Sequence, residues 1–536
     1  MTHHLGPVLV IGNGPVGQTA ALLLAAWEVP VVLLDARPER DPIGSKAICQ
    51  QRDVLDIWEH VGVGAQIAAE GLTWTEAVTL YRDSELFRQG FVDRGESPFP
   101  PFVNISQART EKLLDEKIAA HPLIDVRWGH RVVGLEQDDD GVTVSCELAP
   151  GVEGQGGVAE VRGSYAVVCS GARSEALRTC LGLTFEGKTF TDQFLICDIR
   201  TDLPDWAFER RFYFDPEWNP GRQVLIHPCP DSTFRIDWQV PPEYDLSVEE
   251  ASGALDERIR HVIGDRDYEI VWKSLYRFHS RQVDRMRIGR VLLAGDAAHL
   301  VSPFGARGLN SGVPDAENAA WKLAFVVRGW AGEELLDSYH DERHAAAAEN
   351  IEVTTATMRF LVPQNEQEWC ERREILEAAG SQDSARARVD SGRLAEPFWY
   401  VDSPLTTACG TRPFGGRPPR GEAPAVCPGV LVPDVQVTVD GASVRLRELA
   451  RSGVTVLCGE GVDPAAVREA LGAATEAGMP LGVHALADVD PRGAVAAALE
   501  ARPGEVFVLR PDAHLAAVLD SVELLAPTLA RLLPAA

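Results

Sequence analysis

The sequence predicts an α/β protein of mixed α+β type with more than one domain. A strand, a glycine turn, a helix and a second strand follow one another over residues 8–35. A strand-rich segment with many aromatic side chains covers residues 185–240, and residues 408–433 are rich in Pro, Gly and Arg. Because 536 residues are too many for one ordinary core, two or three domains are expected.

The first unit has the features of a dinucleotide-binding βαβ motif. Its first strand is short and β-branched, as in a strand buried on both faces. Gly12, Gly14 and Gly17 form a GxGxxG turn, in which the second glycine lets a pyrophosphate approach the backbone. Asp35 ends the next strand, where it can accept from a ribose hydroxyl. The alternative is a purely structural turn, and Arg37 either stacks on an adenine or lies in solvent.

The following segments alternate between the sequence periodicity of helices and that of strands. Helical patterns are expected at 45–63, at 110–120 and from the 310s to about 380, and strands at 75–105 and 125–170. The Pro- and Gly-rich stretch near 408–433 is typical of a linker. About a hundred residues after it alternate strands with Ala-rich helices, which predicts a small separate α/β domain.

A second glycine-rich stretch, residues 290–312, follows another buried strand. Asp296 lies at the carboxyl end of that strand, the end that faces the ligand crevice in an open parallel sheet. Alternatively, Asp296 caps the helical segment that starts at Ala297. One dinucleotide that meets both glycine motifs must be long, and FAD with its ribityl chain meets that demand.

The glycine-rich loop precedes a helix with one apolar face. Free N–H groups at a helix start stabilise negative charge, which a reduced flavin carries on its pyrimidine ring. A flat ring that lies against the chain needs bare backbone, and this loop offers Gly305, Gly308, Leu309 and Asn310.

Composition excludes several classes of partner. The formal net charge of −28 argues against nucleic acid and anionic membranes, which would repel the protein. The ten cysteines form no CxxC pair, which indicates a reducing compartment and suggests no zinc site. We expect a cytoplasmic protein, because no signal peptide and no apolar stretch of membrane-spanning length is found.

Three motifs together resemble the class A flavoprotein monooxygenases, the single-component aromatic hydroxylases similar to phenol, hydroxybenzoate and hydroxyphenylpropionate hydroxylases. The motifs are GNGPVG with Asp35, the sequence CSGARSEALR at 169–178, and GDAAHLVSPFGARGLNSGVPDAENAAWKL at 295–323. The resemblance covers about residues 5–400. The C-terminal part resembles the thioredoxin-like domain of the phenol hydroxylase branch, but it has no CxxC, which makes thiol–disulfide chemistry there improbable.

The resemblance implies a Rossmann-like FAD-binding domain of the hydroxybenzoate hydroxylase type. The first part of this FAD-binding domain would be residues 1–180, although 75–105 would contribute to the substrate domain. The strand-rich substrate domain would be residues 181–280. The second part of the FAD-binding domain, with helices, would be residues 281–400. A linker at 401–433 would lead to the thioredoxin-like domain at 434–536.

The resemblance also implies the roles of individual residues. Gln107, beside Arg109, matches a FAD-contacting Gln, and Pro303 would flank the isoalloxazine where oxygen reacts. The remaining cofactor contacts would be Gly12, Gly14 and Gly17 at the pyrophosphate, Asp35 at the ribose, Lys46 in place of the family's usual Arg, Asp296 at the ribityl or pyrophosphate side, and the backbone of Gly308, Leu309 and Asn310 at the pyrimidine edge. Ser170 departs from the family's Asp-Gly-Ala-Arg-Ser motif, which puts the use of the nicotinamide in doubt.

The implied activity is hydroxylation of a phenolic or aromatic substrate, with a polycyclic natural product as one option. NADPH or NADH reduces the flavin, O₂ adds to give a flavin hydroperoxide, and the ring takes the terminal hydroxyl. Baeyer–Villiger or epoxidation chemistry on a polyketide-like substrate and a flavin-binding redox sensor without turnover are the alternatives. Oligomeric state stays open, a homodimer being one option.

A base or a cation that favours the phenolate is the expected contribution of the protein. Besides Pro303, the candidates for catalysis are Tyr213, His227 and Arg235, with His279 as a further substrate contact. Each of these also has a plain structural interpretation, as core, loop or salt-bridged residue. For His299 we expect a structural hydrogen bond.

Overall fold

A computed structural model describes residues 6–44, 46–90, 97–152, 157–392, 394–418, 422, 424–472 and 478–535. Its centre is a sheet with the strand order β17-β18-β11-β1-β2-β7, parallel except for the β17–β18 pair. The strands are β1 Val8–Ile11, β2 Val31–Leu34, β7 Ile124–Arg127, β11 Tyr165–Val168, β17 Arg287–Ile288 and β18 Val291–Leu293.

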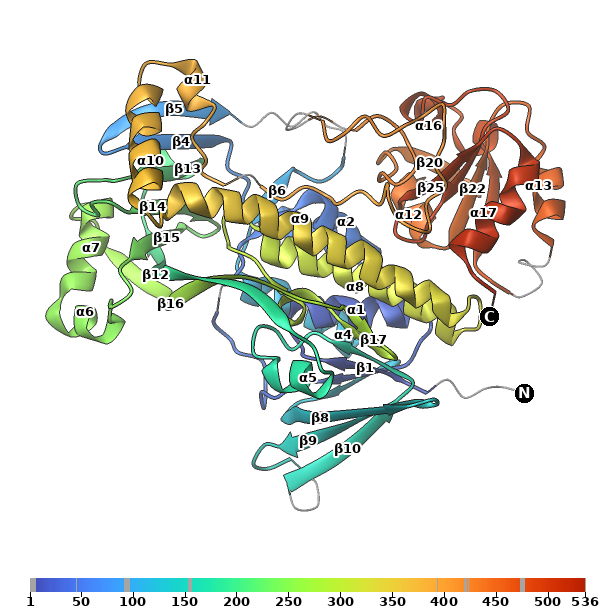
Figure 1. Cartoon of the computed structure of the whole chain (residues 1–536), viewed down its shortest axis with the longest axis horizontal. Coiled ribbons are helices and arrows are strands. Elements are labelled where there is room, and N and C mark those ends of the chain that lie inside the picture. The colour runs from blue at the N-terminus through green and yellow to red at the C-terminus, as the bar shows by residue number, and fades with distance from the viewer. Residues whose placement is uncertain are drawn as a thin grey trace.

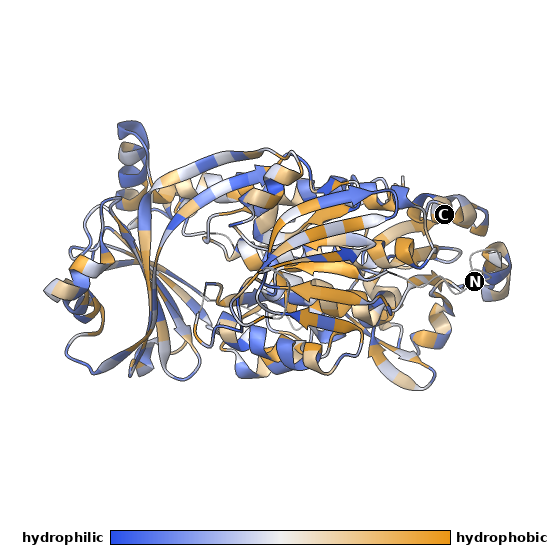
Figure 2. Ribbon diagram, turned by 90° about the horizontal axis from the view of Figure 1, so that it is seen from below, coloured by the Kyte–Doolittle hydropathy of each residue, from blue (hydrophilic) through white to orange (hydrophobic). Residues whose placement is uncertain are grey.

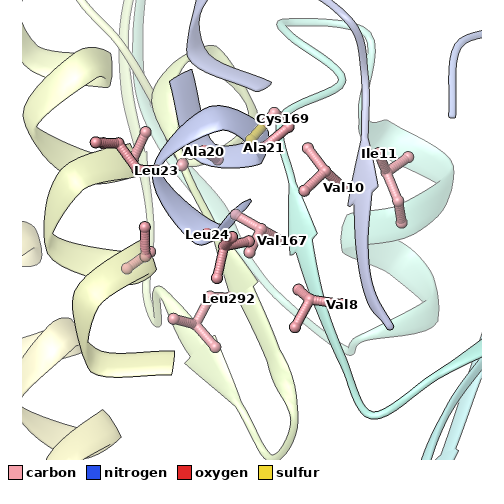
Figure 3. Packing of buried hydrophobic residues seen from close by; sticks show 14 of the residues in the cluster. Val8, Val10, Ile11, Ala20, Ala21, Leu23, Leu24, Val167, Cys169 and Leu292 are labelled. Atoms are coloured by element: carbon pink, nitrogen blue, oxygen red, sulfur yellow. The ribbon is translucent and has the colours of Figure 1, made fainter. Parts of the chain in front are cut away.

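The parallel strands are buried on both faces, which explains their unbroken apolar sequence. Helix α1 (Pro15–Ala26) packs on one face, and Val8, Val10 and Val167 lie close to its Ala20 and Leu24 (Figure 3). The hydropathy colouring shows these strands as an apolar band inside the molecule (Figure 2). The predicted mixed α/β class is confirmed.

Further elements surround this sheet. Strand β3 (Cys49–Gln51) pairs with β6 (Phe102–Asn104), so the helix expected over 45–63 begins only at Arg52. A smaller antiparallel sheet lies beyond the parallel one (Figure 1). The other elements are α2 Arg52–His60, α3 Gly64–Glu70, α4 Gln107–Ala119, β8 His130–Asp138, β9 Gly141–Leu148, β10 Val158–Gly163 and α5 Glu175–Cys180.

A second large sheet has the order β19-β16-β12-β15-β14-β13-β4-β5. Its two longest strands, β12 and β16, pair with each other and run from this sheet toward the parallel sheet (Figure 1). The strands are β4 Glu76–Tyr81, β5 Ser84–Gly90, β12 Phe185–Thr201, β13 Glu209–Phe214, β14 Gln223–Cys229, β15 Thr233–Val240, β16 Tyr268–Val283 and β19 His299–Leu300.

The two faces of this second sheet have different neighbours. On one face, Ile226 and Trp238 pack against α7 (Ala254–Ile263), which follows α6 (Leu246–Ser252). On the other, Phe194 and Phe212 pack around Phe304 of the glycine-rich loop. We call the face that packs around Phe304 the loop-side face. Since strand side chains alternate between faces, each residue of this sheet can be assigned to one of the two.

Long helices cover the junction of the two sheets, and the C-terminal region lies at one end of α8 and α9 (Figure 1). The helices are α8 Arg307–Val327, α9 Asp337–Leu361, α10 Glu366–Ala379 and α11 Asp383–Arg386, with 3-10 turns η2 Pro204–Trp206, η3 Gly295–Ala297 and η4 Glu333–Leu336. None of the helices in the described ranges is both long and apolar enough to cross a bilayer.

The C-terminal region contains a mixed sheet with the order β23-β22-β24-β25 and a hairpin of β20 and β21. Strand β22 is parallel to β23 and antiparallel to β24. The elements are β20 Gln436–Val439, β21 Ala442–Arg445, α12 Leu446–Arg451, β22 Val454–Cys458, α13 Pro464–Ala470, β23 Leu481–Ala485, α15 Leu486–Val489, α16 Ala494–Ala498, β24 Val506–Leu509, β25 Leu515–Leu519, η5 Val522–Leu524 and α17 Leu525–Leu532.

Candidate functional site

The GxGxxG turn joins β1 to α1, and its three glycines have different surroundings. A Cβ on Gly12, whose φ is +110°, would lie 2.5 Å from the carbonyl oxygen of Cys169, and one on Gly17 would lie 1.8 Å from that of Gly12. A Cβ on Gly14 would meet nothing within 4 Å. The first and third glycines are therefore required by the fold, whereas the second leaves the backbone open to a ligand. No side chain caps the start of α1, so its N–H groups face the same open space.

Asp35 follows β2 beside this turn, but its carboxylate already has partners. It accepts from the N–H of Asn13 at 2.7 Å and from the Nε and Nη2 of Arg37 at 2.9 and 3.0 Å. Although burial opposes ionisation, these hydrogen bonds hold the pKa of Asp35 below its usual range. The Arg37 guanidinium lies 5.7 Å from the ring centre of Trp128. A ribose contact for Asp35 and an adenine contact for Arg37 stay predictions.

Asp296 lies in η3, directly after β18. The residue is exposed, yet the protein around it disfavours the carboxylate and raises its pKa. His299 and Lys46 oppose this rise only in part, and Asp296 contributes to the raised pKa of Tyr276, about 12, whose main cause is burial. No side-chain capping bond from Asp296 is found.

Gln107 begins α4 and holds the segment next to Lys46. Its Oε1 accepts from the N–H of Ala47 at 3.0 Å, and its Nε2 donates to Glu111 at 2.8 Å. Arg109 instead pairs with Glu70 at 2.6 Å, with both side chains about one third exposed. Gln107 therefore positions one wall of the site, and the Arg109 side chain is engaged elsewhere.

The loop around Pro303 leads directly into α8, which begins earlier than the sequence suggested. Pro303 is exposed, and its carbonyl accepts from the N–H of Ala306 at 2.9 Å. Gly308 and Leu309 lie in the first turn of the helix, and a Cβ on Gly308 would meet nothing within 4 Å. Asn310 is buried and ties the helix to β3 by donating to the carbonyl of Cys49 at 2.9 Å. Its side chain is thus occupied, while the backbone of the first turn is open.

Asp315 is a buried residue of α8 that the sequence interpretation missed. Its Oδ2 accepts from the N–H of Gly295 at 2.9 Å and lies 2.7 Å from Nε2 of His299, and its Oδ1 accepts from Nε of Arg343 at 2.7 Å. Burial opposes ionisation, but Arg343 and these hydrogen bonds lower the pKa of Asp315 to about 2. Asp315 therefore fixes the backbone at Gly295, the residue before Asp296, and His299 has the structural hydrogen bond expected of it.

The segment with the altered motif forms a local turn. The hydroxyls of Ser170 and Ser174 lie 2.7 Å apart, and Ser174 donates to the carbonyl of Gly171 at 2.6 Å. Arg178 of the same segment donates to the carbonyl of Ala297 at 3.0 Å and so links this turn to η3. The effect of Ser170 on the nicotinamide stays a prediction.

The catalytic candidates of the second sheet divide between its two faces. His227 and Arg235 are cross-strand partners on the loop-side face, and Arg235 donates to the carbonyl of Lys46 at 3.1 Å. Tyr213 is directed to the opposite face, where it lies 5.7 Å from Trp218 and accepts from Nε of Arg211 at 3.0 Å. The sheet therefore separates Tyr213 from the loop, and a catalytic role for Tyr213 stays a prediction.

Asp237, a further polar residue of this face, was also missed. It lies opposite Leu225 on β14, and its Oδ1 has no hydrogen-bond partner within the described part of the chain. Burial and the nearby Asp198 raise its pKa to about 7, although Arg235 and Arg210 oppose this. The Nδ1 of His227 also lacks a partner there, and burial beside the two arginines holds the pKa of His227 well below its usual range.

Other observations complete the site. His279 shares a hydrogen bond of 3.0 Å with the hydroxyl of Thr189 at the exposed edge of β16. A small cavity lies on the loop-side face at β4 and β13, with Trp74, Thr79 and Arg210 in its lining. No group of three or more His, Cys, Asp or Glu side chains in the described segments is arranged to hold a metal ion.

Comparisons with known proteins assign this architecture to a family. A family model described as "FAD binding domain" matches residues 6–354. The 3-(3-hydroxy-phenyl)propionate/3-hydroxycinnamic acid hydroxylase of Mycolicibacterium smegmatis is 28% identical over 532 residues, covering 94% of this chain and 89% of that protein. Rifampicin monooxygenase of Streptomyces venezuelae is 32% identical over 372 residues, covering 66% of this chain and 71% of that protein.

Solved structures agree over nearly the whole chain. Aklavinone-11 hydroxylase, solved with FAD and aklavinone, aligns with a TM-score of 0.78 and 26% identity over 99% of this chain and all of that one. The flavin-dependent monooxygenase PieE, solved with FAD and substrate, aligns with a TM-score of 0.84 and 24% identity over 99% of both chains, which shows the shared fold.

Proposed function

The chain belongs to the FAD binding domain family of flavin-dependent monooxygenases, and from this premise we propose that it hydroxylates a phenolic ring. A polycyclic natural product is the favoured substrate class, since the chain resembles aklavinone-11 hydroxylase over its full length. The observation that carries the proposal is Oδ1 of Asp237, which has no hydrogen-bond partner among the described residues and lies on the loop-side face, the face that packs around Phe304.

The described residues fit FAD. We propose that Gly14 and the start of α1 hold the pyrophosphate, that Asp296 receives the ribityl chain, and that the backbone of Gly308 and Leu309 faces the pyrimidine edge. Support comes from the open space at both glycines and from the exposure of Asp296 at the end of β18. Bound FAD would supply the redox chemistry, with NADPH or NADH as electron donor and O₂ as the source of the transferred oxygen atom.

Asp237 is the proposed proton acceptor. In this step the phenolic O–H bond breaks, its proton moves to Oδ1 of Asp237, and its electron pair stays on the oxygen, which makes the ring more nucleophilic. A pKa of about 7 suits this role, because a base works best when its pKa is near the operating pH. The charged and titratable groups that act on Asp237 are Arg235 on the same strand, Asp198 on β12 and Arg210 on β13, and His227 lies beside them on β14.

The two arginines contribute to the same step. Arg235 is held by Asp198 through hydrogen bonds of 2.7 and 2.9 Å, so its charge is largely compensated. Arg210 lies over Trp74 and Phe212, 5.9 and 5.5 Å from the ring centres, at the edge of the small cavity. We therefore assign to Arg210 the stabilisation of the negative oxygen that deprotonation creates.

The test of the function begins with the visible spectrum of the purified protein. NADH and NADPH oxidation and O₂ uptake are then measured with 3-(3-hydroxyphenyl)propionate, rifampicin, aklavinone and simple phenols, and products are analysed for one added oxygen. Absence of bound or bindable flavin would overturn the proposal. Flavin without substrate-stimulated oxidation would favour a redox sensor, and oxygen insertion beside a ketone would favour Baeyer–Villiger chemistry.

The role of Asp237 is tested with Asp237→Asn and the active compound. Because only the carboxylate accepts a proton, parental kcat/KM should rise with pH through about 7. In the variant this rise should disappear, and kcat should fall roughly 10²- to 10⁴-fold, the usual contribution of a general base. A variant with the parental pH profile would exclude Asp237 as the base while leaving the flavin chemistry intact.

We also propose that residues 434–536 form a thioredoxin-like domain and that the enzyme is cytoplasmic. The mixed sheet β23-β22-β24-β25 with flanking helices supports the first proposal. Support for the second comes from the cysteines, since every one of those that the structure describes is a free thiol.

A further inference from the structure

A buried guanidinium connects the C-terminal region to the helices behind the flavin loop. Arg510 follows β24 and donates to both carboxylate oxygens of Glu342 on α9, at 2.6 and 2.9 Å. It also donates to Asp512 at 2.7 Å, which in turn accepts from Nε1 of Trp321 on α8 at 3.1 Å. The C-terminal region thus contributes charged groups to the interior of the FAD-binding part.

From Glu342 a continuous series of hydrogen bonds leads toward η3. Asn318 of α8 donates to Glu342 at 2.7 Å and to the hydroxyl of Tyr400 at 3.3 Å. The same hydroxyl accepts from Nη1 of Arg343 at 2.9 Å. Arg343 donates onward to Asp315, which holds the N–H of Gly295. We call this set the buried relay: Arg510, Glu342, Asn318, Tyr400, Arg343 and Asp315.

Burial makes the relay sensitive to the loss of any member. The six side chains belong to residues that are at most 3% exposed. Removing one partner of such a set leaves an uncompensated polar or charged group, and the neighbours must rearrange to satisfy it. Lys322 donates at 2.6 Å to Oε2 of Glu342, the same oxygen that accepts from Asn318. Without Arg510, the Glu342 carboxylate would lose two donors and would reorient, which would change the bond that Asn318 makes to it.

We propose that the C-terminal region positions the FAD-binding loop through the buried relay, so that the affinity for FAD depends on Arg510. Arg510 acts as a positioning residue, since it lies in the C-terminal region while the relay ends at Gly295, next to Asp296. The inference rests on the proposed placement of FAD at Asp296. It gives the C-terminal region a role in the reaction that requires no thiol chemistry.

The experiment compares full-length variants by their FAD dissociation constants, measured from the quenching of flavin fluorescence on titration of the apoproteins. Arg510→Gln should raise the constant about 10-fold and shift the visible band of bound FAD. Tyr400→Phe, which removes the hydroxyl that accepts from both Asn318 and Arg343, should raise it about fivefold. The matched control is Arg447→Gln, which removes a 2.9 Å ion pair between α12 and Asp53 of α2 outside the relay and should leave the constant within twofold.

The double variant Arg510→Gln/Tyr400→Phe separates positioning from general destabilisation. If both residues act through one relay, its FAD affinity should be no weaker than that of Arg510→Gln alone, because coupled losses are not additive. Additive losses, a parental constant in both single variants, or an equal loss in Arg447→Gln would overturn the inference. If Arg510→Gln does not fold, the FAD dissociation constants of Tyr400→Phe and Arg447→Gln are compared instead, and a loss of affinity confined to Tyr400→Phe supports the inference. A parent that binds no FAD would refute the proposed function instead.

Discussion

Replacing Gly14 or Gly17 by alanine should separate FAD binding from folding. The two glycines are three residues apart in one turn, and both substitutions add one methyl group. At Gly17 the new Cβ would lie 1.8 Å from the carbonyl oxygen of Gly12, whereas at Gly14 it would meet no atom within 4 Å. The added methyl group therefore clashes with the backbone at position 17, whereas at position 14 it occupies the space proposed for the pyrophosphate.

The expected magnitudes follow from these distances. A contact of 1.8 Å requires the turn between β1 and α1 to shift, so Gly17→Ala should cost about 3 kcal/mol or more of unfolding free energy. For 536 residues, with an unfolding entropy of about 2.1 cal/mol/K per residue, that corresponds to a fall in Tm of about 3 °C or more. Gly14 has φ −92° and ψ −178°, which alanine adopts freely, so Gly14→Ala should change the stability by less than about 1 kcal/mol.

The assay combines thermal unfolding of the apoproteins with FAD titration. Gly14→Ala should keep the parental Tm but bind FAD at least about 10-fold more weakly, a loss of about 1.4 kcal/mol. Gly17→Ala should have a lower Tm than the parent already as the apoprotein. Gly14→Ala with parental FAD affinity would refute the assignment of this turn to the pyrophosphate, and Gly17→Ala with parental Tm would refute the steric argument.

Three further predictions concern single side chains. Asp296→Ala should weaken FAD retention on gel filtration, and a variant that keeps its flavin as well as the parent would contradict the assigned role. Asp237→Asn should raise the Tm relative to the parent at pH 8 but not at pH 4. Because the folded-state pKa of Asp237 is raised to about 7, its ionisation destabilises the native state as the pH rises from about 4 through 7. An equal difference in Tm at both pH values would speak against this. Tyr213→Phe should leave KM for the substrate unchanged, because its hydroxyl contacts Arg211 on the opposite face of the sheet; a raised KM would place Tyr213 at the site after all.

Features that depend on contacts between near neighbours could be predicted from the sequence. The glycine turn, the strand before it and the helix after it follow from local sterics and from an apolar pattern that a parallel strand requires. Hence the sequence identifies Gly12, Gly14 and Gly17 as one turn between β1 and α1 and places Asp296 at the end of its strand, while their contacts with the cofactor stay predictions. The cofactor follows from these motifs, and the family match confirms it.

Features that depend on register and on long-range pairing were decided by the tertiary structure alone. Tyr213 lies among three consecutive buried aromatic residues of β13, so the sequence pattern does not reveal which side of the strand meets the loop, and one residue of register reverses the answer. Asp237 becomes a candidate base only because folding buries it and brings Arg210 of β13 and Asp198 of β12 beside it. Asp315 and Arg510 are 195 positions apart, and only folding joins them through the buried relay. The sequence by itself thus determined the cofactor and its turn, and tertiary packing decided which side chains act beside it.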